Sequence, residues 1–434
     1  LFIHMPSGYS QIVPKASKQN YGFETEPESN TAGRKLYWPR GRGWGGSSSI
    51  NAMIYTRGHS SDYDHWRQLG NPGWSYDDVL PYFKRAENYE GDGDEEFHGQ
   101  GGPLNVKKST REDDILLDKF VEAGKQAGFP LTNDFNGKQQ EGFSRYEHTI
   151  KGSKRFSSAR AYLYPALNRK NLHTKTNITV DKVIFKNKKA IGVEYFEKGK
   201  KKVSGCNREV ILSSGAVNSP QILNLSGIGN GNVLRKYGIN VIVDNKNVGE
   251  HLQDHLTVNV SFNVNQNTFY EELRGINLIK HLFNYMIKGK SIFSYSAADV
   301  GVFFKLNSSS KRPDFQIHFA PGAGEYHNDG TMNPISGITA SVCHLRPQSR
   351  GTVKIASNNH NQAPLIDYNY LSVESDREYL LEGVKKTRDF FNAIALADLA
   401  PKEILPGSQI NTDVQLKEFI KETALSVYHP VGTC

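Results

Sequence analysis

The sequence is poor in cysteine and has no long apolar run. Its 434 residues include three cysteines, Cys206, Cys343 and Cys434, a number too small and odd for a disulfide framework, so the chain suits a reducing compartment. No apolar run approaches the roughly 20 residues that a membrane-spanning helix needs. No Cys/His spacing is typical of a metal site, so we predict no metal. The expected location is cytoplasmic, and peripheral attachment to a membrane is left open.

Positively charged residues are in modest excess. The net charge is +8 and the pI is about 9.0. The positive residues are dispersed except in 186–189 and 198–202, which have the Gly or Asn of hairpin turns. This arrangement favours a solvated face over a nucleic-acid partner, and it helps to capture an anionic cofactor. Hydrophobic residues make up 37% of the chain, which is enough for one large domain or two smaller ones.

A loop rich in glycine and serine spans residues 39–51. Such a backbone bends tightly and exposes successive N–H groups that suit a phosphate. Gly41, Gly43 and Gly46 have the spacing G-x-G-x-x-G, but Pro39 interrupts the approach and no apolar strand precedes it. We therefore interpret the segment as a phosphate-side loop and not as the first turn of a Rossmann unit. From these residues alone, a mobile linker is equally open.

The segment 171–215 predicts a strand meander followed by a helix. Apolar residues alternate between Lys-Asn and Lys-Gly turns, and a final strand is expected over 210–212. Ser219 as N-cap and Pro220 as the first helical residue predict a helix that stops at Gly227. A strand, a small-residue turn and a helix N-terminus make a seat for an anion, but an ordinary βα unit fits equally well.

Other segments give simpler signals. Ser75 is the expected N-cap of a helix with acids in its first turn. Beyond residue 260 the pattern is α+β: an apolar helical face occurs over 278–286, and the segments 315–319 and 338–342 alternate as strands. No internal repeat or low-complexity tract is present.

Six motifs in order give a resemblance that covers nearly the whole chain. They span residues 38–51, 70–74, 215–229, 248–255, 345–351 and 428–434. Each is weak alone, but together and in this order they resemble the glucose-methanol-choline (GMC) flavin oxidoreductases. The first and third correspond to the two signatures of that family. The branch that contains choline and aliphatic-alcohol dehydrogenases is the most similar.

The resemblance implies an α/β plus α+β fold. A Rossmann-like FAD-binding domain would occupy residues 1–260, without the N-terminal βαβ unit of the family. A substrate domain on a mostly antiparallel sheet would occupy residues 261–434. Such an enzyme oxidises a small alcohol to an aldehyde or ketone by hydride transfer to flavin N5, and oxygen or a quinone accepts the electrons.

The same resemblance assigns roles to residues. His429 matches the catalytic histidine, and an imidazole suits the base that this chemistry needs. The residues implied to bind the cofactor are Gly43, Gly45, Gly46, Ser47, Asn51, Ala52, Met53, Ile54 and Val180. Ile50 stands where some members carry the histidine that links FAD covalently, so we predict non-covalent FAD. Asp299 matches a position near the cationic headgroup in choline-oxidising relatives, although a buried hydrogen-bonding role is the alternative.

Three other outcomes stay open. A hydroxynitrile lyase shares this fold and keeps its flavin oxidised, and a non-enzymatic binding protein would use the basic face. The chain runs from Leu1 to Cys434, so we also expect a fragment without both termini, lacking the second catalytic His or Asn of the family. An inactive fragment is the third outcome. For His251 and His255 we favour a structural role.

Overall fold

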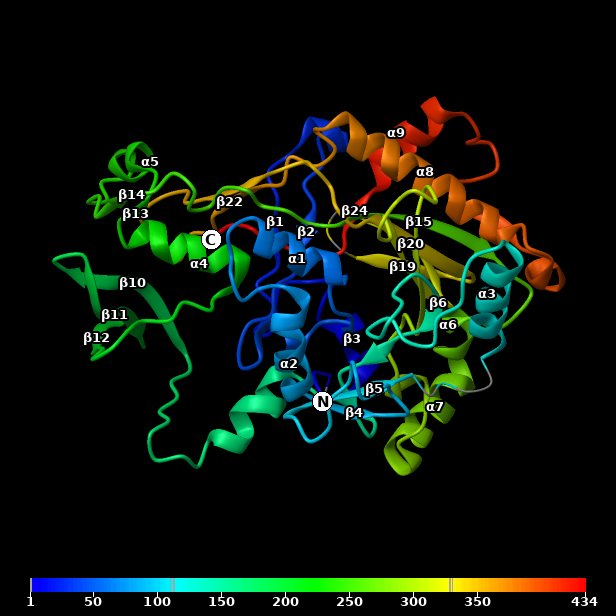
Figure 1. Ribbon diagram of the computed structural model, residues 1–434, viewed down its shortest axis with the longest axis horizontal. Helices are drawn as coiled ribbons and strands as arrows, with labels where there is room; N and C mark the ends of the chain where they lie inside the picture. The colour runs from blue at the N-terminus through cyan, green and yellow to red at the C-terminus, as the bar shows by residue number, and fades with distance from the viewer. Residues whose placement is uncertain (1, 110, 112–113, 328, 330) are drawn as a thin grey trace.

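The computed structural model describes residues 2–434 except 110, 112, 113, 328 and 330. Its main feature is a seven-stranded antiparallel sheet in the order β23–β15–β20–β17–β16–β6, with β24 also paired to β15 (Figure 1). The strands are β6 (Gly142–Arg145), β15 (Leu256–Asn263), β16 (Val300–Phe304), β17 (Phe315–Ala320), β20 (Ile338–His344), β23 (Lys402–Leu405) and β24 (Leu425–Ser426). The predicted antiparallel sheet and both predicted strands are confirmed.

Alternation along the strands gives this sheet two different faces. In β17, Phe315 and Phe319 are fully buried against helices, while His318, between them, lines a large cavity. Helices α3 (Ile115–Gln126) and α8 (Glu374–Phe391) cover the apolar face (Figure 1). Phe120 of α3 stacks on Phe319 with ring centroids 4.0 Å apart. Burying one such ring contributes about 2–3 kcal/mol, so this face holds the core and the other face is free for a site.

A second, four-stranded sheet lies beside the first. Its order is β3 (Ile54–Tyr55), β7 (Glu147–His148), β5 (Leu104–Lys108) and β4 (Glu87–Glu90). Helices α1 (Ser60–Gln68) and α2 (Tyr76–Ala86) precede β4. Ser75 caps α2 as predicted: the Asp78 carboxylate accepts from the Ser75 N–H at 3.1 Å, and the Ser75 hydroxyl accepts from the Asp78 N–H. This capping box satisfies N–H groups that the helix leaves unpaired.

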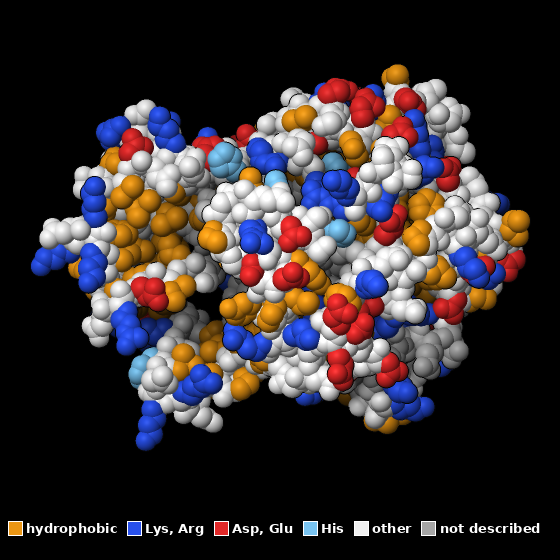
Figure 2. All heavy atoms as spheres, in the orientation of Figure 1, with side chains coloured by type: hydrophobic (Ala, Val, Ile, Leu, Met, Phe, Trp, Pro, Cys, Tyr) orange, Lys and Arg blue, Asp and Glu red, His pale blue; other side chains and the backbone are white. Residues whose placement is uncertain are grey.

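A lobe on the left of Figure 1 contains the predicted meander. It consists of β10 (Ile178–Lys186), β11 (Lys189–Glu197) and β12 (Lys200–Gly205), packed against α4 (Gly215–Leu225). The same lobe holds β13 (Ile228–Gly229), α5 (Gly231–Lys236) and β14 (Val243–Asp244). Figure 2 shows apolar side chains gathered on its surface. The meander itself is confirmed.

The strand expected over 210–212 is wrong. These residues have no assigned strand, and no described residue pairs with them. An apolar, β-branched segment becomes a strand only where a neighbour accepts its ladder of hydrogen bonds. Here the segment leads into α4 without such a neighbour.

The predicted start of α4 after Ser219 is also wrong. The helix begins at Gly215, so Pro220 lies inside it. A proline cannot donate to the carbonyl four residues earlier, which here belongs to Ala216. The Thr433 hydroxyl donates to that carbonyl at 2.7 Å and so compensates for the missing bond. The predicted stop is confirmed, because Gly227 follows the helix with a φ of 87°.

The remaining elements are short. They comprise β1 (Phe23–Glu24), β2 (Tyr37–Trp38), β8 (Ile150–Lys151), β9 (Lys154–Arg155), β18 (Ala323–Tyr326), β19 (Met332–Ile335), β21 (Thr352–Lys354), β22 (Leu365–Asp367), α6 (Phe269–Glu272), α7 (Gly275–Lys288) and α9 (Asp413–Thr423). The helix predicted over 278–286 lies within α7. Across the described part of the chain, no helix combines the length and apolar character needed to cross a bilayer. The boundary between regions 1–260 and 261–434 stays a prediction.

Candidate active site

A cavity of about 1340 Å³ opens on the polar face of the main sheet. Six of the predicted site residues line it: Ser47, Asn51, Ala52, Met53, Ile54 and His429. They come from the two ends of the chain. The cavity is larger than the roughly 300–1,000 Å³ that one small ligand occupies, so it has room for a cofactor ring beside a substrate.

The glycine-rich loop beside the cavity is folded into a short 3-10 helix, Gly46–Ser49. The Ser48 hydroxyl donates to the Gly45 carbonyl at 2.6 Å, and the Ser49 hydroxyl donates to the Trp44 carbonyl at 2.8 Å. These bonds fix the loop, so the mobile-linker alternative is wrong. Gly43 and Gly46 have φ angles of 112° and 51°, and open space lies where each would carry a Cβ. A ligand can therefore approach the backbone closely.

The segment after this loop is held rigidly against the cavity. Met53 has a φ of 64°, a left-handed conformation that costs a non-glycine residue about 1–2 kcal/mol. The Asn51 side-chain oxygen accepts from the Met53 N–H at 3.1 Å and from Arg155 Nη1 at 2.7 Å. The Met53 carbonyl accepts from the Thr149 N–H at 2.9 Å. A shaped, strained backbone beside an open cavity fits a bound FAD better than simple packing.

Two histidines meet at the base of the cavity. Antiparallel chain segments bring them together, because the Val427 N–H donates to the His255 carbonyl at 2.9 Å. The Nδ1 atoms of His255 and His429 are 3.2 Å apart, and His255 Nε2 is 2.9 Å from the Leu345 carbonyl. A carbonyl only accepts, so the proton of His255 is on Nε2 and its Nδ1 is an acceptor. His429 then donates from Nδ1, which leaves its Nε2 with a free lone pair.

Both imidazoles are neutral near pH 7. Burial lowers the pKa of His255. Burial also lowers the pKa of His429 well below its usual value. The charge of Arg40 acts in the same direction, as would the charges of His255 and His318 if those rings were protonated. Desolvation lowers the pKa of the half-buried His318 nearby to about 4. Among the described residues none hydrogen-bonds Nε2 of His429, so this atom is available to a substrate hydroxyl.

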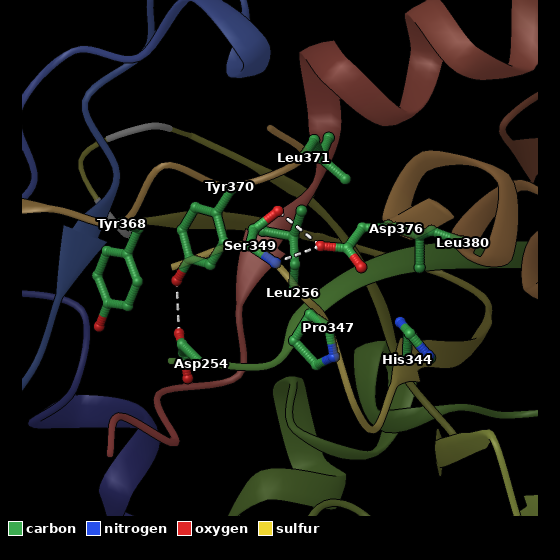
Figure 3. Close-up of a pocket in the computed structure, with 10 residues that line it drawn as sticks. All are labelled: Asp254, Leu256, His344, Pro347, Ser349, Tyr368, Tyr370, Leu371, Asp376 and Leu380. Carbon is green, nitrogen blue, oxygen red and sulfur yellow. Dashed lines mark hydrogen bonds between the residues drawn. The ribbon is translucent and has the colours of Figure 1, made fainter. Parts of the chain in front are cut away.

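Asp254 fixes the backbone that carries His429. Its Oδ1 accepts from the His429 N–H at 2.7 Å, and its Oδ2 accepts from the hydroxyls of Ser426 and Tyr370. Figure 3 shows the Tyr370–Asp254 bond beside a small internal cavity. The carboxylate is buried, which raises its pKa. Arg40 adds a further bond, from Nη2 to the Tyr428 carbonyl at 2.7 Å.

Two predicted residues lie away from this cavity. Val180 is in β10, part of the three-stranded lobe. Asp299 is fully buried, with Arg111 Nη1 at 3.7 Å and His148 Nε2 at 3.8 Å. Neither residue belongs to the cavity lining, although Ala298, next to Asp299, does.

Sequence reasoning overlooked Asp254 and Arg40, and it gave His255 only a structural role. Asp254 and His255 are adjacent in sequence, and in an extended segment neighbouring side chains point to opposite sides. Asp254 therefore faces the backbone of His429, and His255 faces its ring. The adjacent Asp and His in the sequence could have indicated a functional site. The residue that they position, His429, lies 174 residues from His255.

The folded glycine-rich loop, the cavity beside it and the neutral histidine together fit the site of a flavin-dependent oxidoreductase. The chain belongs to the GMC oxidoreductases: the family's N-terminal model matches residues 24–257 and its C-terminal model matches residues 347–434. It is therefore an FAD-dependent oxidoreductase that acts on CH–OH donors.

Individual relatives support this assignment. The chain is 40% identical over 435 residues to "Oxygen-dependent choline dehydrogenase" of Brucella anthropi, covering all of this chain and 78% of that protein. It is 39% identical over 437 residues to "Choline dehydrogenase, mitochondrial" of Mus musculus, covering all of this chain and 72% of that protein.

Solved structures show the same fold. Pyridoxine 4-oxidase from Mesorbium loti superposes with a TM-score of 0.87 at 25% identity, covering all of this chain and 81% of that one. Formate oxidase of Aspergillus oryzae superposes with a TM-score of 0.90 at 23% identity, with the same coverage.

Proposed function

We propose that His429 is the base that activates the substrate hydroxyl. The observation that carries this proposal is the hydrogen-bond chain from the Leu345 carbonyl through His255 to His429, which leaves Nε2 of His429 unprotonated and open to the cavity. In this scheme His255 is a positioning residue that fixes the tautomer of its neighbour. As His429 takes the hydroxyl proton, its Nδ1–H stays bonded to His255, so the ring does not turn.

The residues that would hold FAD are those of the first signature. Ser47 and Asn51 to Ile54 would contact it from the cavity wall, and Gly43, Gly45 and Gly46 would let its phosphates approach the loop. Val180 is proposed for the adenine side. When bound, FAD supplies the hydride acceptor for the alcohol carbon. Ile50 has no nucleophilic atom, so we propose non-covalent FAD.

The charges in the cavity favour an uncharged alcohol. Among the described residues, Asp62 is the one carboxylate in the lining, and it is ion-paired with Arg312. Five described arginines also line the cavity: Arg40, Arg57, Arg312, Arg346 and Arg350. Glu87 and Asp314 pair with Arg57 and Arg346. Within the described residues, no carboxylate forms an ion pair with Arg40 or Arg350. A fixed cation such as choline would meet net positive charge there. The names of the relatives favour choline, in which case Asp299 would have to reach the headgroup from behind the wall.

Anaerobic flavin bleaching tests these proposals. The FAD-loaded full-length protein would be mixed with choline and with the uncharged isostere in which carbon replaces nitrogen. We expect faster bleaching with the isostere, whereas faster bleaching with choline would overturn the substrate assignment. A flavin that stays oxidised with every alcohol would favour the lyase. Readmitting oxygen or adding a quinone then shows which acceptor restores the colour.

Variants test the base. His429→Gln is expected to lower the bleaching rate about 100-fold or more while FAD stays bound. The control is His251→Asn, which changes an exposed histidine of the same motif with a φ of 61°, a conformation that asparagine tolerates. Equal rates in both variants would refute the role of His429.

A further inference from the structure

Helix α7 presents an apolar stripe to solvent. Ile276 and Met286 are 77% and 80% exposed, and Ile279, Phe283 and Ile287 are also exposed. Their spacing of three and four residues places them on one side of the helix. No residue of α7 is buried, and the helix lies at the lower edge of the molecule in Figure 1. A stripe of this size on a surface helix marks an interaction site.

The opposite side of α7 is anchored. The Tyr285 hydroxyl donates to the Ser153 carbonyl at 3.2 Å, in the turn between β8 and β9. His281 Nε2 is 2.9 Å from a carboxylate oxygen of Glu272 in α6. The helix is therefore held in place with its apolar stripe turned outward.

Five exposed lysines lie on α7 or on segments next to it. Lys280 and Lys288 are on α7, Lys290 follows it, and Lys151 and Lys154 lie on the adjoining β8–β9 hairpin. Within the described residues none of the five forms an ion pair with a carboxylate. We call these five residues the lysine collar. An apolar stripe beside unpaired basic residues is typical of helices that lie in an anionic membrane interface.

We propose that α7 docks the protein on an anionic bilayer. The apolar stripe enters the boundary between headgroups and acyl chains, and the lysine collar contacts anionic headgroups. A second copy is a poorer occupant, because a symmetric contact would bring two lysine collars together.

This docking would place the catalytic cavity close to the membrane. The short helix η6 (Ile292–Ser294) follows α7 and contacts η1 (Pro6–Gln11). Tyr9 of η1 lines the cavity. Lipid-dissolved substrates or electron acceptors would then be available near its wall.

Vesicle flotation of the full-length protein tests the proposal. Vesicles of phosphatidylcholine alone would be compared with vesicles that contain about 30% phosphatidylserine, a composition with a strongly negative surface. We expect binding to the anionic vesicles that weakens at high salt. The double variant Phe283→Glu/Ile287→Glu should weaken binding about 100-fold. The control Ile394→Glu changes a side chain that is 83% exposed outside α7 and should bind normally.

Two results would overturn the proposal. One is equal flotation of the α7 variant and the control. The other is a wild-type protein that ignores both vesicles but changes from dimer to monomer in the α7 variant, measured by sedimentation velocity. Because flotation needs no turnover, its failure is distinct from failure of the proposed catalysis.

Discussion

Replacing Asp254 by alanine removes the acceptor that holds the backbone of His429. Three donors lose their partner: the His429 N–H and the hydroxyls of Tyr370 and Ser426. An unsatisfied buried donor costs about 1–3 kcal/mol. The adjoining cavity of about 20 Å³ can admit a water to the vacated space, so we take the lower value for each donor. The expected loss in the free energy of unfolding is about 3 kcal/mol.

Asp254→Ala should also lower kcat, by more than the loss in the free energy of unfolding alone would explain. Without the Asp254 acceptor the peptide of His429 is free to shift, and a displacement of about 1 Å can cost roughly 100-fold in rate. We therefore expect kcat to fall about 100-fold, with FAD still bound. Asp254→Asn keeps an oxygen that can accept from the His429 N–H and should recover most of the rate.

Asp376 provides a matched control. It is as buried as Asp254 and accepts three hydrogen bonds, from the N–H groups of Gln348 and Ser349 and from the Ser349 hydroxyl. Figure 3 shows the two from Ser349. None of these donors belongs to the segment of His429. Asp376→Ala should destabilise the protein similarly but change kcat by less than about threefold. Equal losses of kcat in the two alanine variants, measured with denaturant midpoints for both, would refute the positioning role of Asp254.

Other predictions concern pH and the cofactor. Because burial lowers the pKa of His429, kcat/KM should stay level as pH falls through 6.5; an inflection there, absent from His429→Gln, would contradict a neutral resting base. Burial lowers the pKa of His98, but hydrogen bonds to Asp134 and Glu87 outweigh it and raise the pKa to about 9. Its stabilising charge is therefore fully present below pH 6.5 and lost as pH rises through about 9. His98→Gln should cost roughly 3 kcal/mol in urea unfolding at pH 6 and less at pH 10, and a loss independent of pH would contradict this assignment. Acid precipitation should release all FAD to the supernatant, whereas yellow colour in the pellet would reveal a covalent link.

Local patterns predicted the parts of the fold that depend on neighbouring residues. Alternation placed the strands around Phe315 and Ile338, and the Ser75 capping box needed only residues within one helical turn. The start of α4 could not be predicted, because Pro220 is tolerated inside the helix through a hydroxyl 213 positions further along the sequence, on Thr433. Likewise 210–212 has the composition of a strand, but strand formation depends on a partner that composition does not reveal.

Some parts of the candidate site could likewise be predicted from local sequence, and others could not. The glycine-rich loop and His429 were found through motifs that are contiguous in sequence. The roles of Asp254 and His255 depend on hydrogen bonds to residues more than a hundred positions away. The ring nitrogen that carries the proton in His255 and in His429 is determined by the contact with the Leu345 carbonyl. No sequence pattern could have predicted these tautomers.

The bond between His429 and Asp254 has a consequence for how the protein matures. It joins segments separated by 175 residues, and closing so large a loop loses more chain entropy than forming any local element. The histidine pair is therefore expected to assemble late, after the sheet and its helices have collapsed. A compact, helix-containing intermediate would be inactive, and the exchange rate of the His429 amide hydrogen would distinguish it from the finished enzyme.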